Sequence, residues 1–181
     1  MINEKVLKEN ITSYNDYPIP GITYFDLNPI YKDVALRDEL VAGCHDIMSS
    51  LDVSKKDLWH TSYDYIAVIE SRGFLIGSML AEKFNKGLIL LRSKPGRLPG
   101  KTSLVKHTLE YGESQMEVQD GKGTVLIFDD VLATGGTARA AQEVLTIGGY
   151  TPKAALFLLE LEYCDPNLNL TNQSVLNIKE L

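Results

Sequence analysis

The sequence has few cysteines and no long apolar run, and each shortage argues against a class of protein. Cys44 and Cys164 are the only cysteines among 181 residues, and they fit neither a disulfide framework nor a metal-ligand spacing. The longest uninterrupted apolar run, residues 154–159, is far shorter than the ~20 residues that span a bilayer. Residues 1–5 contain no apolar signal core. We therefore expect a cytoplasmic protein with reduced thiols and no membrane segment.

Positive charge is also scarce. The chain has 18 lysines and arginines against 24 acids, a net charge of −6, which disfavours a general binder of nucleic acid or anionic membranes. The stretch 92–109 is the exception, because it carries no acid and five cations: Arg92, Lys94, Arg97, Lys101 and Lys106. Taken alone, such a run is explained by a solvated loop. A positive loop on an acidic body also suits a small polyanion, and the segments described below favour this second interpretation.

Short apolar runs alternate with helical patterns along the chain, without repeats or an interdomain linker. The length and a hydrophobic content of 44% predict one domain, residues 1–181. Together the elements indicate an α/β fold, a mostly parallel central sheet flanked by helices, whose ligands bind where strands end. We predict strands at 65–69, 88–91, 125–128, 154–161 and 174–178, and helices at 3–13, 35–51, 74–84 and 137–147.

The segment 125–137 is the most informative part of the sequence. An apolar strand is followed by two aspartates and then by a Thr-Gly-Gly-Thr turn that opens a helix. The glycines let the backbone approach an anion closely, and the helix contributes the positive end of its dipole, so the turn predicts a phosphate site. It lacks the lysine and the wider spacing of a Walker loop, which disfavours an ATPase.

Asp129 and Asp130 would repel a phosphate, so they must serve another group. Carboxylates accept hydrogen bonds from a vicinal diol and also approach magnesium. A phosphate cradle beside diol acceptors describes a ribose 5-phosphate site. The alternative, a strand-end turn with an Asp helix cap, explains either half of the segment alone but not both together.

This segment resembles the phosphoribosyl-pyrophosphate signature of the type I phosphoribosyltransferases. The resemblance implies that Asp129 and Asp130 bind the ribose hydroxyls. It also implies that the 5′-phosphate lies among Ala133, Thr134, Gly135, Gly136 and Thr137. Phosphoribosyl-pyrophosphate synthases and some repressors share the signature, so it indicates the ligand better than the reaction.

Two further segments resemble adenine phosphoribosyltransferases in particular. In Glu70-Ser71-Arg72-Gly73, the resemblance places Ser71 and Arg72 at the pyrophosphate. The similar loop of these enzymes often has a cis peptide before the Ser, so the resemblance also implies a cis or otherwise strained Glu70–Ser71 bond, a kind of bond that persists mainly at functional sites. Leu109-Glu110-Tyr111-Gly112 implies that Glu110 assists the purine as a general acid or orienting group. Glu110 and Arg72 are the predicted catalytic residues.

The Gly- and Pro-rich segment after Leu91 is similar to the lid loop of the same family. We predict a flexible lid over residues 92–110, which would exclude water from the reaction. Its cations Lys94, Arg97 and Lys101 are expected near the pyrophosphate. Ser93 stands where relatives often carry a basic residue.

Residues 14–33 are similar to the N-terminal hood that covers adenine in these enzymes. A planar base needs an apolar slot with backbone amides at its edge, and Thr23, Tyr24 and Phe25 are the predicted base-binding residues. Phe25 stands where many relatives have arginine, which puts the choice of base in question.

The resemblance therefore implies a homodimeric enzyme of purine salvage that binds no nucleic acid. It would transfer the phosphoribosyl group of phosphoribosyl pyrophosphate to adenine and give AMP and pyrophosphate. Mg²⁺ would be held mainly by the substrate, near Asp129 and Asp130 but without a direct protein ligand. Two alternatives stay open: a transferase for xanthine or another 6-oxopurine, and a non-catalytic regulator that senses phosphoribosyl pyrophosphate.

Overall fold

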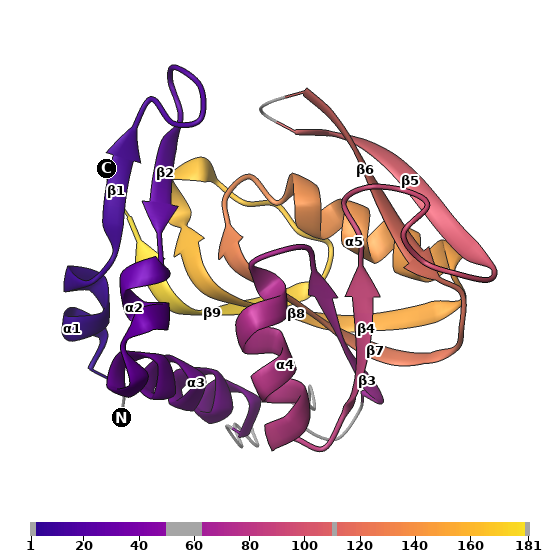
Figure 1. Ribbon diagram of the computed structural model, residues 1–181, viewed down its shortest axis with the longest axis horizontal. Helices are drawn as coiled ribbons and strands as arrows, with labels where there is room; N and C mark the ends of the chain where they lie inside the picture. The colour runs from indigo at the N-terminus through magenta and orange to yellow at the C-terminus, as the bar shows by residue number, and fades with distance from the viewer. Residues whose placement is uncertain (1–2, 50–62, 110–111, 180–181) are drawn as a thin grey trace.

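A five-stranded parallel sheet forms the centre of the computed structural model, which describes residues 3–49, 63–109 and 112–179 (Figure 1). Every pair of neighbouring strands in this sheet is parallel, as the sequence predicts for an α/β fold. Across the sheet the strands run in the order β4 (Gly87–Leu91), β3 (Tyr65–Ile69), β7 (Gly123–Leu132), β8 (Tyr150–Leu161) and β9 (Thr171–Ile178).

Both faces of the sheet are covered, which explains why its central strands contain runs of buried apolar residues, such as residues 66–69, 125–128 and 154–159. Successive side chains of a strand point to opposite faces, so Ile66 and Val68 join one hydrophobic cluster while Ala67 and Ile69 join the other. The first cluster is completed by α1 (Glu4–Glu9), α2 (Asn28–Lys32), α3 (Val34–Ser49) and α4 (Gly73–Lys83). The second is completed by α5 (Gly136–Ile147) and the hairpin of β5 (Thr102–Leu109) and β6 (Gly112–Gln119). Among the helices of the described ranges, none is long and apolar enough to cross a bilayer.

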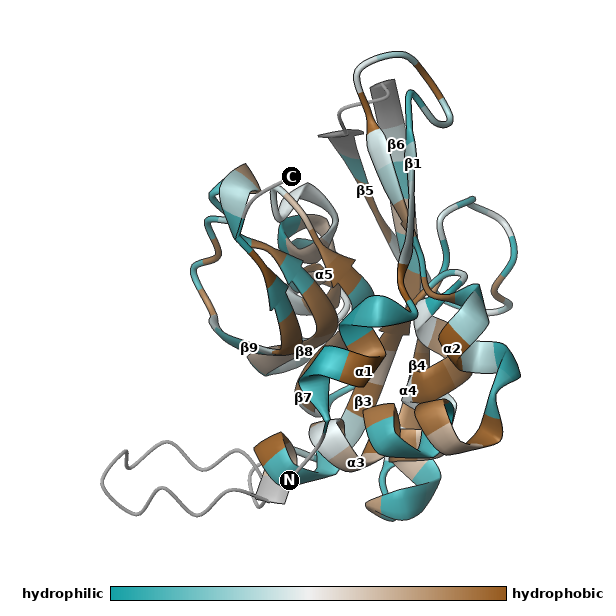
Figure 2. Cartoon of the chain, turned by 90° about the vertical axis from the view of Figure 1, so that its left-hand side faces the viewer, coloured by the Kyte–Doolittle hydropathy of each residue, from teal (hydrophilic) through white to brown (hydrophobic). Residues whose placement is uncertain are grey.

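Two antiparallel hairpins rise on either side of the edge where the sheet's strands end. One is formed by β1 (Thr12–Asn15) and β2 (Thr23–Asp26), the other by β5 and β6. Figure 1 shows them at the two flanks, and Figure 2 shows both projecting beyond the same end of the sheet. The carboxyl ends of the strands, where ligands bind in such folds, therefore lie between the two hairpins.

The predicted helix 3–13 is wrong beyond Glu9. The chain leaves the helix at Asn10, whose amide still bonds to carbonyls of the last turn, and residues 12–15 then pair with β2 as a strand. Thr12 and Tyr14 are residue types that strands favour, and the partner strand, which lies farther along the chain, supplies their hydrogen bonds.

The predicted lid, residues 92–110, is a loop only in its first half. From Thr102 onward the chain forms β5, which pairs with β6 along its length and buries Ser103 and Val105 beneath the hairpin. Strand β7 is also longer than predicted, because β8 continues to pair with it: Asp129 lies opposite Phe157. The two aspartates therefore belong to the strand and do not follow it.

Candidate active site

Three adjoining cavities open at the carboxyl end of the sheet, and Arg72 lines all of them. The turn cavity, about 180 Å³, is formed by residues 129–138 with Phe157. The hood cavity, about 190 Å³, lies between residues 21–25 of the N-terminal hairpin and the end of β8. The lid-side cavity, about 420 Å³, lies between residues 69–72 and the strand β6.

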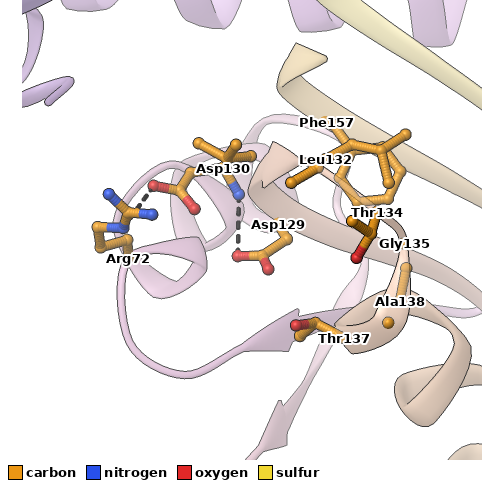
Figure 3. A pocket seen from close by; sticks show the side chains of 12 residues that line it. Arg72, Asp129, Asp130, Leu132, Thr134, Gly135, Thr137, Ala138 and Phe157 are labelled. Atoms are coloured by element: carbon orange, nitrogen blue, oxygen red, sulfur yellow. Dashed lines mark hydrogen bonds and ion pairs between the residues drawn. The ribbon is translucent and has the colours of Figure 1, made fainter. Parts of the chain in front are cut away.

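The turn at residues 134–137 has the geometry of an anion cradle. Gly135 caps α5 in the left-handed conformation, with φ +82°, and a Cβ there would come within 3.0 Å of both Arg139 Nη1 and Leu168 Cδ2. Only glycine fits this position without strain. Residues 134–138, at the start of α5, line the turn cavity (Figure 3), so the cavity lies at the positive end of the helix dipole.

Arg139 supports this turn, and the sequence analysis did not single it out. Its Nη1 donates to the carbonyl of Thr134 at 3.0 Å and to the carbonyl of Asn167 at 2.6 Å. One guanidinium therefore ties the phosphate turn to the loop that precedes β9. The sequence could have indicated this role, because Arg139 lies in the first turn of a predicted helix that follows a Gly-Gly pair.

Asp129 and Asp130 lie in different surroundings although they are neighbours. Asp130 is 2% exposed and forms an ion pair with Arg72, Nε to Oδ2 at 2.8 Å. Asp129 is half-buried, and its Oδ1 accepts the amide hydrogen of Asp130 at 2.9 Å. Burial raises the pKa of Asp129 well above its ordinary value, and the charge of Asp130 raises it further. Burial also raises the pKa of Asp130, although Arg72 opposes that shift.

Arg72 joins the predicted ribose site to the predicted base site. Besides its ion pair with Asp130, it donates from Nη1 to the hydroxyl of Tyr24 at 2.7 Å and, more weakly, to the carbonyl of Phe25 at 3.5 Å. Its Cζ lies 4.9 Å from the centroid of the Tyr24 ring. Burial alone would lower the pKa of Arg72, but Asp130 and its other neighbours raise it, so the side chain is a permanent cation.

The hood cavity brings together the three predicted base-binding residues, Thr23, Tyr24 and Phe25. Phe25 is 8% exposed and also belongs to the hydrophobic core. The opposite wall comes from the end of β8 and the short 3-10 turn η1 (Glu162–Cys164), which the sequence analysis did not predict. The sequence could have indicated this wall, because a turn that follows a buried parallel strand lies at the edge of the sheet where ligands bind.

The lid-side cavity contains the predicted Ser71 and Arg72. The Glu70–Ser71 peptide bond is cis, as expected from the sequence. Ser93 and residues 114–116 of β6 complete the wall, and the sequence analysis gave the β6 residues no role.

The predicted lid cations are dispersed. Arg97 pairs with Glu70, which lines the lid-side cavity, whereas Lys101 pairs with Asp120 at 2.8 Å. Lys94 is exposed, and of these three cations none lines the cavities described above. Glu110, the other predicted catalytic residue, lies outside the described residues. Within residues 3–49, 63–109 and 112–179, no group of three or more His, Cys, Asp and Glu side chains could hold a metal ion.

Comparison with known proteins identifies the family, although no family model matches the chain. An adenine phosphoribosyltransferase of Prochlorococcus marinus (strain NATL1A) is 44% identical over 159 residues, which cover 86% of each chain. That of Thermosipho africanus is 36% identical over 176 residues, 95% of this chain and 97% of the relative.

A solved structure has the same fold. It is adenine phosphoribosyltransferase from Saccharomyces cerevisiae, complexed with D-2,5-dideoxy-2,5-imino-altritol 1,6-bisphosphate and adenine. The two chains superpose with a TM-score of 0.83 and 29% identity, over 95% of this chain and 97% of the other. Relatives and fold agree with the resemblance seen in the motifs: the chain belongs to the adenine phosphoribosyltransferase family.

Proposed function

We propose that this chain transfers the 5-phosphoribosyl group of phosphoribosyl pyrophosphate to adenine, giving AMP and pyrophosphate. The observation that carries the proposal is the meeting of three cavities at Arg72. A phosphate cradle, an apolar slot and a third, larger space adjoin one cation, which suits a ribose 5-phosphate that exchanges pyrophosphate for a base at its anomeric carbon. Family membership supports the same reaction.

Each cavity has a proposed occupant. The turn cavity takes the 5′-phosphate and the ribose hydroxyls, the hood cavity takes adenine, and the lid-side cavity takes the pyrophosphate. The cavity-lining residues proposed for these roles are Ala133, Thr134, Gly135, Gly136 and Thr137 at the phosphate, Asp129 and Asp130 at the ribose, Thr23, Tyr24 and Phe25 at the base, and Ser71 and Arg72 at the pyrophosphate. The cations Lys94, Arg97 and Lys101, which line none of the three cavities, are also proposed to act on the pyrophosphate.

The proposed reaction is displacement at the anomeric carbon with an oxocarbenium-like transition state. Arg72 lines the cavity proposed for the departing pyrophosphate, and its fixed positive charge would stabilise the negative charge that develops there. Glu110 is proposed to hold or move the proton of the purine. The hood (residues 14–33) and the lid (residues 92–110) are proposed to exclude water, whose attack would compete with transfer to the base.

Magnesium fits this site as a companion of the substrate. Asp130 is engaged by Arg72, so Asp129 is the carboxylate of the pair that is left to approach a cation, and no cluster of three acidic or imidazole ligands exists among the described residues. Mg²⁺ commonly binds through one or two carboxylates together with substrate phosphates. When bound, it would neutralise pyrophosphate charge. A cytoplasmic homodimer, which family membership supports, completes the proposal.

The test is a panel of bases. Purified protein, Mg²⁺ and phosphoribosyl pyrophosphate are mixed separately with adenine, hypoxanthine, guanine, xanthine, uracil and orotate, and nucleotide formation is followed. AMP from adenine alone is expected. A preference for a 6-oxopurine would overturn the choice of base while leaving the transfer chemistry intact. Absence of any product, with phosphoribosyl pyrophosphate still bound, would indicate a regulator.

Two variants make the panel specific to the site. Asp129→Asn is expected to lower kcat/KM at least about tenfold, because it removes a charged acceptor proposed for the ribose. Lys122→Met is the matched control, since Lys122 is an exposed residue beside the opposite end of β7, and it should behave as the unchanged protein.

A further inference from the structure

Glu70 receives four contacts on its two carboxylate oxygens, and none of the roles above includes it. Its Oε2 accepts from the amide of Ser93 at 2.8 Å and from the Ser93 hydroxyl at 2.9 Å. Its Oε1 pairs with Arg92 Nη2 at 3.2 Å and with Arg97 Nη1 at 3.4 Å. The side chain is 13% exposed and lines the lid-side cavity together with Ser93.

The charge of this group is fixed by its neighbours. Burial alone would raise the pKa of Glu70, but the hydrogen bonds from Ser93 and the charges of Arg92 and Arg97 outweigh burial and hold the pKa below its ordinary value. The carboxylate is therefore ionised at neutral pH, and with the two guanidiniums it forms a cluster of one net positive charge beside the cavity.

A second carboxylate also binds this segment. Glu117 of β6 is 4% exposed, and its Oε2 accepts the amide of Arg97 at 3.2 Å. The backbones of Glu117 and Arg92 also exchange two hydrogen bonds of 2.9 Å. Residues 92–97 are thus held along the backbone, and what remains to be fixed is the direction of the arginine side chains.

The two arginines differ in how they are held. Arg92 is 21% exposed and also lies 5.8 Å from the centroid of the Phe74 ring, within the range of a cation–π contact. Arg97 is 46% exposed, and Glu70 is the acid that pairs with it in the described part of the chain. Loss of the Glu70 charge would therefore release Arg97 more than Arg92.

We propose that Glu70 is a positioning residue that acts through Arg97, holding this guanidinium beside the lid-side cavity, where the pyrophosphate of the substrate is proposed to bind. The inference rests on the proposed function, because it needs pyrophosphate in the lid-side cavity. A cation held in advance binds an anion without the cost of ordering a long side chain. Ser93 contributes because its small hydroxyl bonds to Glu70, whereas a basic residue at this position would compete with the arginines for the carboxylate.

The test begins with Glu70→Gln. The glutamine carbonyl can still accept from Ser93, but its NH2 group faces the arginines and cannot accept from them. We expect the KM for phosphoribosyl pyrophosphate to rise about tenfold, the loss of one charge-assisted contact, with the KM for adenine unchanged. An unchanged KM for phosphoribosyl pyrophosphate overturns the inference. A lower KM also overturns it, because it would mean that Glu70 competes with pyrophosphate for Arg97.

A double-mutant cycle separates positioning from general support of the fold. Arg97→Met and the double variant are measured beside Glu70→Gln, with Lys122→Met as the control for loss of a positive charge. If Glu70 acts through Arg97, the double variant is no worse than Arg97→Met alone; additive effects contradict the proposal. Should Glu70→Gln fail to fold, Ser93→Ala removes only the hydroxyl contact and should raise the same KM two- to threefold, whereas no rise rejects the inference.

The outcomes also distinguish this inference from the proposed function. If the unchanged protein forms no nucleotide from any base, the proposed function fails. If it forms AMP but Arg97→Met leaves the KM for phosphoribosyl pyrophosphate unaltered, the enzyme stands and the positioning role of Glu70 is rejected.

Discussion

Removal of the Arg72 guanidinium should destabilise the protein as well as inactivate it. Asp130 is 2% exposed, and its ion pair with Arg72 spans 2.8 Å. A buried carboxylate that loses its partner costs about 3–5 kcal/mol. The Arg72 side chain is 36% exposed, so water can partly replace it, and we expect the lower end of that range for Arg72→Met, about 3 kcal/mol. At about 2–4 °C per kcal/mol for a chain of this size, Tm should fall by roughly 6–12 °C.

The pH dependence of this loss has a definite sign. Burial raises the pKa of Asp130 in the folded protein, and removal of Arg72 should raise it further. A raised folded-state pKa favours folding below the unfolded-state pKa, and this advantage disappears as the pH rises through the folded-state value. The stability difference between Arg72→Met and the unchanged protein should therefore be small near pH 4 and should grow toward neutral pH.

Thermal unfolding followed by circular dichroism measures this prediction. Asp130→Asn and the double variant Arg72→Met/Asp130→Asn complete the set, and the double variant should regain most of the lost Tm because position 130 no longer carries a buried charge without a partner. The reasoning is refuted if Arg72→Met unfolds within about 1 kcal/mol of the unchanged protein at neutral pH, or if the double variant is no more stable than Arg72→Met.

Two further predictions concern the same cavities. The pKa of Asp129 is raised by burial and by the neighbouring Asp130 carboxylate, so the charge of Asp129 destabilises the folded protein. Asp129→Asn should therefore stabilise the unliganded protein by about 1 kcal/mol, more at neutral than at acid pH, although activity falls. A lower Tm of this variant in thermal unfolding would contradict the predicted repulsion between the two carboxylates. Cys164 lines the hood cavity, whereas Cys44 is fully buried and its thiol pKa is raised. A small thiol reagent should therefore inactivate the enzyme through Cys164, AMP should slow the loss, and Cys164→Ser should resist it; equal inactivation of that variant would reject the assignment.

The centre of the sheet could be predicted because its middle strands are buried on both faces. In residues 65–69 no charged residue interrupts the apolar pattern that predicts a strand, and the bounds of this strand in the structure equal those predicted. Strand β5 was not predicted, because only one of its faces is buried. Its outward face carries Lys106, and the hydrogen bonds and the burial of Val105 that define it come from β6 and the second hydrophobic cluster, which no local pattern reports.

The site divides in the same way between local and distant structure. The turn at residues 134–137 is built from consecutive residues, so its geometry could be inferred from their types. The sequence placed Arg72, Asp130 and Tyr24 in three separate roles, at pyrophosphate, ribose and base. The structure joins them directly, through an ion pair and a hydrogen bond between segments some 48 residues or more apart. Only folding brings such groups within 3 Å of one another.

Phe25 shows how a departure in sequence can leave a site intact. Its side chain is 8% exposed and packs in the core, while its carbonyl faces Arg72 Nη1 at 3.5 Å. The polar contact from this position toward the site is thus made by the backbone, which any residue supplies. The stronger contact of Arg72 in the hood comes from the Tyr24 hydroxyl at 2.7 Å, and it too is independent of the residue at position 25. Phenylalanine in place of arginine therefore adds apolar surface to the slot without removing the contacts that hold Arg72. An apolar slot favours a planar purine, so this departure is compatible with adenine as the base.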